Sequence, residues 1–208
     1  MVRSNSKPLF SGMSISEVIR VRIGKMTEEV NNLNSTMMEA RGTPVITNEL
    51  FDKCRLRVPV IDRNGIKILA HGEEGVEAGR SYDSRHGRAT VKGSYVIFEA
   101  PFVGDYSLFF CQPSQSPLGG IGGFEVNQQS LAFRWSQPGR DPGIHKAAFL
   151  NALAEVDKCL ETLRKDAADS DRTIRQAIEH ALKQRTSELA EYRDMIQGIG
   201  FPLKQQNR

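Results

Sequence analysis

Cysteine is scarce in this sequence, and long hydrophobic runs are lacking. The 208 residues include three cysteines (Cys54, Cys111 and Cys159) without a C-x-x-C pair, so neither a disulfide framework nor a structural zinc site is expected. Three isolated thiols fit a reducing compartment. No run approaches the roughly 18 apolar residues of a membrane-spanning helix, and the polar start lacks the apolar region of a signal peptide. We therefore expect a cytoplasmic protein without a membrane partner.

The sequence also lacks a marked excess of charge of either sign. Its 28 Lys and Arg residues are balanced by 25 Asp and Glu residues, which leaves a net charge of +3. Such a balance does not require a nucleic acid or an acidic membrane surface as partner. None of the four histidines has a second ligand at a recognised metal-binding spacing. We expect no metal and no cofactor.

The hydrophobic pattern changes its period along the chain. Residues 1–13 are polar and Ser-rich, which predicts a disordered tail. Apolar residues then recur at steps of three and four over 15–37, the pattern of one amphipathic helix. Residues 58–135 hold short runs rich in Val, Ile and Phe between turn signals such as Asp62-Arg63-Asn64-Gly65, which predict mainly antiparallel strands. We assign 14–140 to one domain, a helix plus a β-rich part.

A long helical region is predicted to follow. Asp141 and Pro142 form a helix start signal, and Gly198 is a candidate C-cap, so the region covers 141–198 and leaves 199–208 as a tail. Apolar residues at a spacing near 3.5 favour a helical hairpin or a coiled coil. Asp and Ser concentrate in 166–171, where we expect a bend. The predicted fold class is α+β.

Large apolar side chains supply the candidate interaction surface. The apolar side of the helical region is expected to need cover from another polypeptide, so we predict a protein partner or self-association through the C-terminal helices. The run Pro101-Phe102-Val103-Gly104-Asp105 is the most distinctive short segment, and core packing around a structural turn is the competing interpretation. The candidate interaction residues are Leu153, Leu160, Leu163, Ile178, Leu189, Phe102 and Asp105.

Basic residues of the helical region support nucleic-acid binding as an alternative function. Acidic residues interleave with them, which is typical of a solvated helix or of charge pairs in a coiled coil. A dedicated nucleic-acid binder normally carries a stripe of one sign. The candidate residues for this alternative are Arg172, Arg175, Lys183 and Arg185.

An enzyme is the second alternative. The segment 81–88 concentrates Ser, Asp, His and Arg, and together with Asp105 its residue His86 could serve acid–base chemistry. A solvated loop has the same composition, and no nucleophile–base pair or metal set is apparent. The run Gly119–Gly123 resembles a phosphate loop, but a strand-like run follows it where a helix is required. A non-catalytic interaction or regulatory module is therefore the favoured function.

Three separated segments carry a resemblance to a bacterial module. They are Val58-Pro59-Val60-Ile61, then Ala100–Asp105 with Cys111–Ser114, then Arg185 with Ile199–Lys204. In this order they resemble, over residues 14–204, the N-terminal region of uncharacterised multidomain bacterial proteins that carry a restriction-endonuclease-like or TIR-type effector domain. The sequence departs from that pattern at Phe201, where Ile is expected. The resemblance implies a sensor, scaffold or oligomerising part without its effector, in defence against phage.

Overall fold

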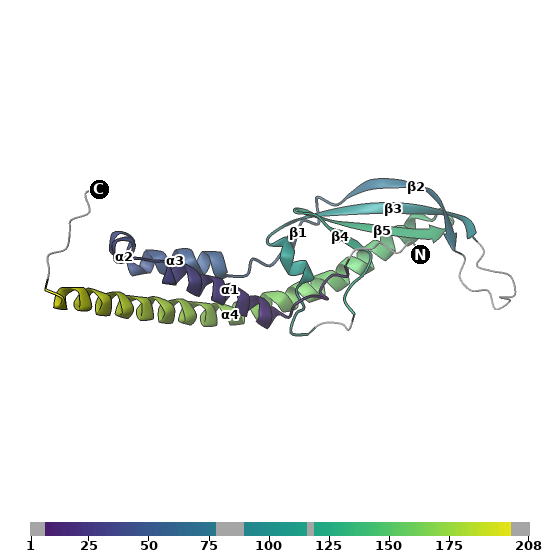
Figure 1. Ribbon diagram of the computed structural model, residues 1–208. Helices are drawn as coiled ribbons and strands as arrows, with labels where there is room; N and C mark the ends of the chain where they lie inside the picture. The colour runs from purple at the N-terminus through teal and green to yellow at the C-terminus, as the bar shows by residue number, and fades with distance from the viewer. Residues whose placement is uncertain (1–6, 78–89, 116–118, 201–208) are drawn as a thin grey trace. The chain divides into compact units, whose positions relative to one another are not determined.

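The computed structural model describes residues 7–77, 90–115 and 119–200, and the chain divides into two compact units (Figure 1). The sheet unit comprises 1–15 and 56–167, and the helical unit comprises 16–55 and 168–208. No described helix is long and apolar enough to cross a membrane. The predicted α+β class is confirmed. The elements are α1 (Ile15–Asn31), α2 (Ser35–Arg41), α3 (Thr43–Cys54), β1 (Val60–Ile61), β2 (Lys67–Glu77), β3 (Thr90–Val103), the 3-10 helix η1 (Tyr106–Phe110), β4 (Phe124–Val126), β5 (Ser130–Pro138) and α4 (Pro142–Gly198).

The sheet unit is built around the long strand β3. Strands β1 and β2 both pair with one edge of β3, β5 pairs with its other edge, and β4 pairs with β5, all antiparallel. The register sets Phe98 of β3 opposite Phe133 of β5. The turn signal at 62–65 therefore separates two strands that each pair with β3 rather than with one another.

The first half of α4 packs against one face of this sheet. The Phe149 ring stacks on Phe98 at a centroid distance of 4.6 Å and lies 5.8 Å from Phe133. Alternation along a strand places every second side chain on the same face, so β3 and β5 present these aromatic rings to the helix. The helix is also held by polar contacts, since the Asp166 carboxylate accepts hydrogen bonds from the backbone and hydroxyl of Ser114.

The helical unit has an aliphatic core between α1, α3 and the second half of α4. The side chains recur at steps of three and four on each helix, so one stripe of each faces the others. Asn34 caps α2 by accepting a hydrogen bond from the Met37 backbone. The α2 helix itself contains no buried residue. The core residues are Met26, Val30, Leu33, Ile46, Leu50, Phe51, Cys54, Ile174, Ile178, Ala181 and Leu182.

Three features differ from the sequence predictions. The chain forms one continuous helix over Pro142–Gly198, so the hairpin alternative is wrong, whereas the bend at 166–171 stays a prediction. Residues 7–13 are part of the folded sheet unit, because Leu9 pairs with Ile121 and is fully buried; the remainder of the predicted tail, 1–6, lies outside the described residues. The boundary between the two units lies within the long helix, after residue 167, whereas the predicted domain boundary lies near the start of that helix, at 140/141.

Candidate functional site

Four of the predicted interaction residues are core residues of the chain itself. Leu153, Leu160 and Leu163 are fully buried in the sheet unit, and Ile178 is fully buried in the helical unit. These apolar side chains are buried, as the sequence predicts, but the surface that buries them belongs to the same chain. They are therefore not available as a docking surface for a separate protein.

Phe102 and Asp105 have structural roles. Phe102 is buried and meets Phe109 edge to face at a centroid distance of 4.9 Å. The Asp105 carboxylate caps η1 by accepting hydrogen bonds from the Ser107 backbone (3.0 Å) and hydroxyl (2.6 Å). The competing interpretation of this segment, core packing plus a turn, is confirmed. The segment 81–88, including His86, lies outside the described residues, so the predicted pairing with Asp105 stays a prediction.

Two of the four basic residues proposed for nucleic-acid binding make contacts within the helical unit. The guanidinium of Arg175 lies 3.7 Å above the centre of the Phe51 ring. Arg185 donates a hydrogen bond to the Leu33 carbonyl (2.9 Å) and pairs with Glu188. The other two, Arg172 and Lys183, are exposed. These contacts give Arg175 and Arg185 a structural task, and they weaken the case for a basic binding stripe.

The structure brings together a serine and a histidine that the sequence did not connect. The Ser94 hydroxyl on β3 donates to the Gly139 carbonyl (2.6 Å), and His145 Nε2 on α4 lies 2.9 Å from the same oxygen. Because the hydroxyl proton is used on Gly139, the imidazole must donate to Ser94 and cannot accept its proton. His145 is buried, and its Nδ1 has no hydrogen-bond partner among the residues that the structure describes. The pair fastens α4 to the sheet, and it is not arranged as nucleophile and base.

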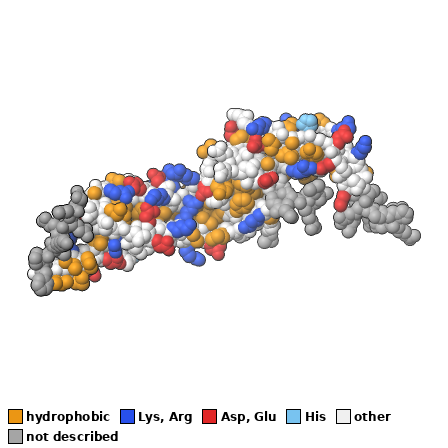
Figure 2. Space-filling model, turned by 45° about the horizontal axis from the view of Figure 1, so that its top comes forward, with side chains coloured by type: hydrophobic (Ala, Val, Ile, Leu, Met, Phe, Trp, Pro, Cys, Tyr) orange, Lys and Arg blue, Asp and Glu red, His pale blue; other side chains and the backbone are white. Residues whose placement is uncertain are grey.

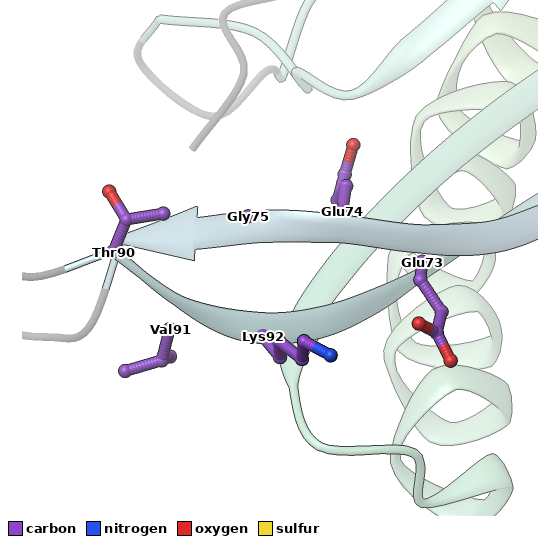
Figure 3. Close-up of a pocket in the computed structure, with 6 residues that line it drawn as sticks. All are labelled: Glu73, Glu74, Gly75, Thr90, Val91 and Lys92. Atoms are coloured by element: carbon purple, nitrogen blue, oxygen red, sulfur yellow. The ribbon is translucent and has the colours of Figure 1, made fainter.

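A groove of about 330 Å³ lies at the end of the β2–β3 pair where β2 finishes and β3 begins (Figure 3). Glu73 and Lys92 point to one side of the hairpin and Glu74 to the other, so the charged groups do not converge (Figure 3). Both carboxylates already have cationic partners, Arg140 for Glu73 and Arg134 for Glu74. A binding site needs polar groups that converge on one ligand, and this groove does not provide them.

The last turns of α4 carry the surface that best fits an interaction site. Leu189, Tyr192 and Ile196 lie at steps of three and four on the same side of the helix as Ile178 and Leu182, and Leu189 comes seven residues after Leu182. Ile199 follows directly after Gly198, the last residue of the helix. Leu189, Tyr192, Ile196 and Ile199 are here called the terminal stripe. Ile178 and Leu182 are buried, but Leu189 and Ile196 are only half-buried. Tyr192 is 62% exposed and Ile199 is 56% exposed. Figure 2 shows hydrophobic side chains on the surface near this end of α4.

Charged residues border the terminal stripe. Glu188 pairs with Arg185 of the same helix, and Arg193 pairs with Glu39 of α2 at 2.9 Å. The Arg193 and Glu39 side chains are 57% and 69% exposed. An apolar centre with a charged rim is the usual layout of an interaction surface. Of the predicted interaction residues, only Leu189 belongs to it.

Neither a cluster of metal-binding side chains nor a known relative indicates a different functional site. Across residues 7–77, 90–115 and 119–200, no group of three or more His, Cys, Asp or Glu side chains could hold a metal ion. No family model, no curated protein and no solved structure matches the chain. The resemblance to defence-associated bacterial modules thus stays a prediction, and the function has to be argued from the terminal stripe.

Proposed function

We propose that this chain is a non-catalytic interaction module that docks a protein partner on the terminal stripe of α4. One observation carries the proposal: the apolar side of the helix that is buried at Ile178 and Leu182 continues to Tyr192 and Ile196, and Tyr192 is mostly exposed, as is Ile199 directly after the helix. Contiguous apolar surface with a charged rim marks interaction sites in soluble proteins. Exposed apolar residues that are scattered singly over a surface would not indicate an interaction site.

The spacing of the stripe argues for helical docking. Steps of three and four keep the side chains on one side of the helix over two turns, which suits insertion into a groove or pairing with a second helix. Covering one large side chain contributes roughly 1.5–3 kcal/mol. Four such side chains, two of them half-buried already, therefore offer enough apolar area for a specific but reversible complex.

The wider role that we attach to this module follows from its resemblance to bacterial effector-linked regions. In that setting the chain would act as a sensor or scaffold in defence against phage, and the docked partner would belong to the same system. A nuclease, TIR-type or nucleotide-cyclase gene beside this one would support that role. The docking proposal does not depend on it.

Photo-crosslinking from within the stripe tests the docking proposal. Tyr192 is replaced by a photo-reactive phenylalanine analogue, and irradiated cells are searched for crosslinked species that contain the chain. Leu150 gives a matched control, since it is a 41% exposed apolar residue on the same helix but in the sheet unit. We expect a crosslinked protein from position 192 and none from position 150. If position 192 gives no crosslinked protein at all, the terminal stripe is not a docking surface.

A paired substitution sharpens the same test. Tyr192→Asp with Ile196→Asp places two charges on the stripe and should abolish the crosslinked or co-purifying species, because an unpaired charge at an apolar interface is costly. Both residues are partly or mostly exposed, so the fold should persist, with unchanged circular dichroism as its check. Leu150→Asp should leave the complex intact.

A further inference from the structure

The geometry points to a second copy of this chain as the partner of the terminal stripe, with the two α4 helices paired in parallel. This inference rests on the proposed function. Leu182, Leu189 and Ile196 are seven residues apart, and Arg185 and Tyr192 form a second series with the same step, offset by three. Ile199 continues the second step just beyond Gly198, where the helix ends. Alternating steps of three and four are the seam of a two-stranded coiled coil, in which each series occupies one core position of the heptad.

The charges beside the seam favour an identical partner. Glu188 lies just before Leu189, and Arg193 lies just after Tyr192, so they take the two flanking positions of the heptad. In a parallel coiled coil, the flanking residue just before a core position on one helix faces the residue that lies five positions later in the sequence of the other helix. Glu188 of one copy then faces Arg193 of the second, and two-fold symmetry repeats the pair. An antiparallel pair would set like flanking positions against each other, so Glu188 would not face Arg193.

The present partners of these charges do not oppose the pairing. Arg193 and Glu39 are both more than half exposed, and exposed ion pairs contribute little to stability. The α2 helix that carries Glu39 has no buried residue. Arg193 can therefore exchange Glu39 for a glutamate of the second copy.

The seam is short, and this determines the kind of dimer to expect. Arg185 occupies the seam position one heptad before Tyr192, but it is bonded to the Leu33 carbonyl inside the helical unit. The free part of the seam therefore begins at Leu189. Coiled-coil pairing is usually sustained over about three to four heptads, so we expect a dimer that forms and dissociates with protein concentration.

A charge exchange between two copies tests the pairing. Sedimentation of the purified full chain should show a concentration-dependent dimer. Glu188→Arg and Arg193→Glu should each weaken it by roughly tenfold, because two symmetric ion pairs become repulsive. An equimolar mixture of the two variants should dimerise as well as the original chain, since arginine and glutamate face one another again at both pairs. Glu191→Arg, an exposed change on the same helix away from the seam, should have no effect.

The outcomes separate this inference from the proposed function. A monomer at all concentrations, together with crosslinking of a different protein from position 192, would overturn the second-copy inference and leave the docking proposal standing. A dimer that does not recover in the mixture would overturn the parallel pairing. A monomer with no crosslinked protein would overturn both. Circular dichroism of each variant checks that the loss is not a loss of fold.

Discussion

In the sheet unit, α4 carries Leu153, Leu160 and Leu163, and each is fully buried. In the helical unit the same helix carries apolar residues at the same spacing to its end, yet Tyr192 is 62% exposed. The two regions share composition and period, and they differ in what packs against them. The sheet unit buries the first region, and α1 and α3 cover the second as far as Leu182. An apolar stripe thus shows that its side chains need to be buried against another surface. It does not show whether the same chain or another protein supplies that surface.

The two regions also use different chemistry to hold the helix. The sheet unit combines stacked aromatic rings with polar contacts from Ser94 to His145 and from Ser114 to Asp166. The helical unit relies mainly on aliphatic packing. Polar contacts with defined geometry specify one arrangement, whereas aliphatic surface is less selective about its neighbour. The helical unit is therefore the region that can more easily accommodate another protein against its apolar surface.

The largest expected effect lies at the aromatic stack. Phe149→Ala should lower the free energy of unfolding of the sheet unit by about 3–5 kcal/mol, because it removes a fully enclosed ring and leaves a cavity. The single tryptophan, Trp135, lies in this unit and reports its urea unfolding by fluorescence. The neighbouring, half-exposed Leu150 is the control, and Leu150→Ala should stay within about 0.5 kcal/mol. Equal losses would mean that α4 does not pack on the sheet through Phe149.

The next effect compares the buried and exposed parts of one stripe. Ile178→Ala should destabilise the helical unit by about 2–5 kcal/mol, measured by denaturant unfolding followed by circular dichroism. Tyr192→Ala in a dilute, monomeric sample should cost no more than about 0.5 kcal/mol, since the ring is mostly exposed. A large loss at Tyr192 in a dilute sample would place the terminal stripe in the core and remove the docking surface.

A smaller effect is expected where polar contacts hold the helix. Ser94→Ala removes the acceptor of the buried imidazole and should cost about 1–3 kcal/mol in the sheet unit, because a buried N–H is left unsatisfied. Ser11→Ala, at an exposed serine of the same unit, should cost less than about 0.5 kcal/mol. The Trp135 fluorescence assay applies to both. If the two substitutions lower the free energy of unfolding by the same amount, the hydrogen bond between His145 and Ser94 does not stabilise the sheet unit.

The smallest effect concerns acid stability of the sheet unit. Hydrogen bonds from Lys67 and then from Ser130 hold the pKa of Glu99 below its usual range. A carboxylate with a lowered folded pKa adds stability above its unfolded pKa, and this stability is lost as the pH falls through the folded value. Glu99→Gln should therefore flatten the decline of sheet-unit stability below the ordinary glutamate pKa. Glu188→Gln in the other unit should leave that decline unchanged.

Several elements could be predicted because their signals are local. The cap at Asp141 with Pro142, and Gly198 at the other end, mark the helix that the structure shows from Pro142 to Gly198. The Asp- and Ser-rich segment 166–171 does not end the helix, because helix propensity is weak compared with packing of the apolar residues around that segment. Leu160 and Leu163 before it, Ala167 within it and Ile174 after it are all buried.

The candidate site was less predictable, because it depends on distant residues. Ser94 and His145 are 51 positions apart in the chain, and no spacing rule connects them. Of the terminal stripe, only Leu189 is among the predicted interaction residues, because the apolar spacing of the region 141–198 does not distinguish covered from exposed positions. A closer signal did exist in the seven-residue steps of Leu189 with Ile196 and of Tyr192 with Ile199.

The sequence alone determined the local structure: where α4 begins and ends, which of its sides is apolar, and that the middle of the chain is β-rich and antiparallel. These follow from caps, periodicity and turn residues, which act over a few positions. Only the tertiary structure decided which part of the apolar side is covered from within and which part is left exposed. Burial is a property of surfaces that meet, and residues far apart in the chain make those surfaces.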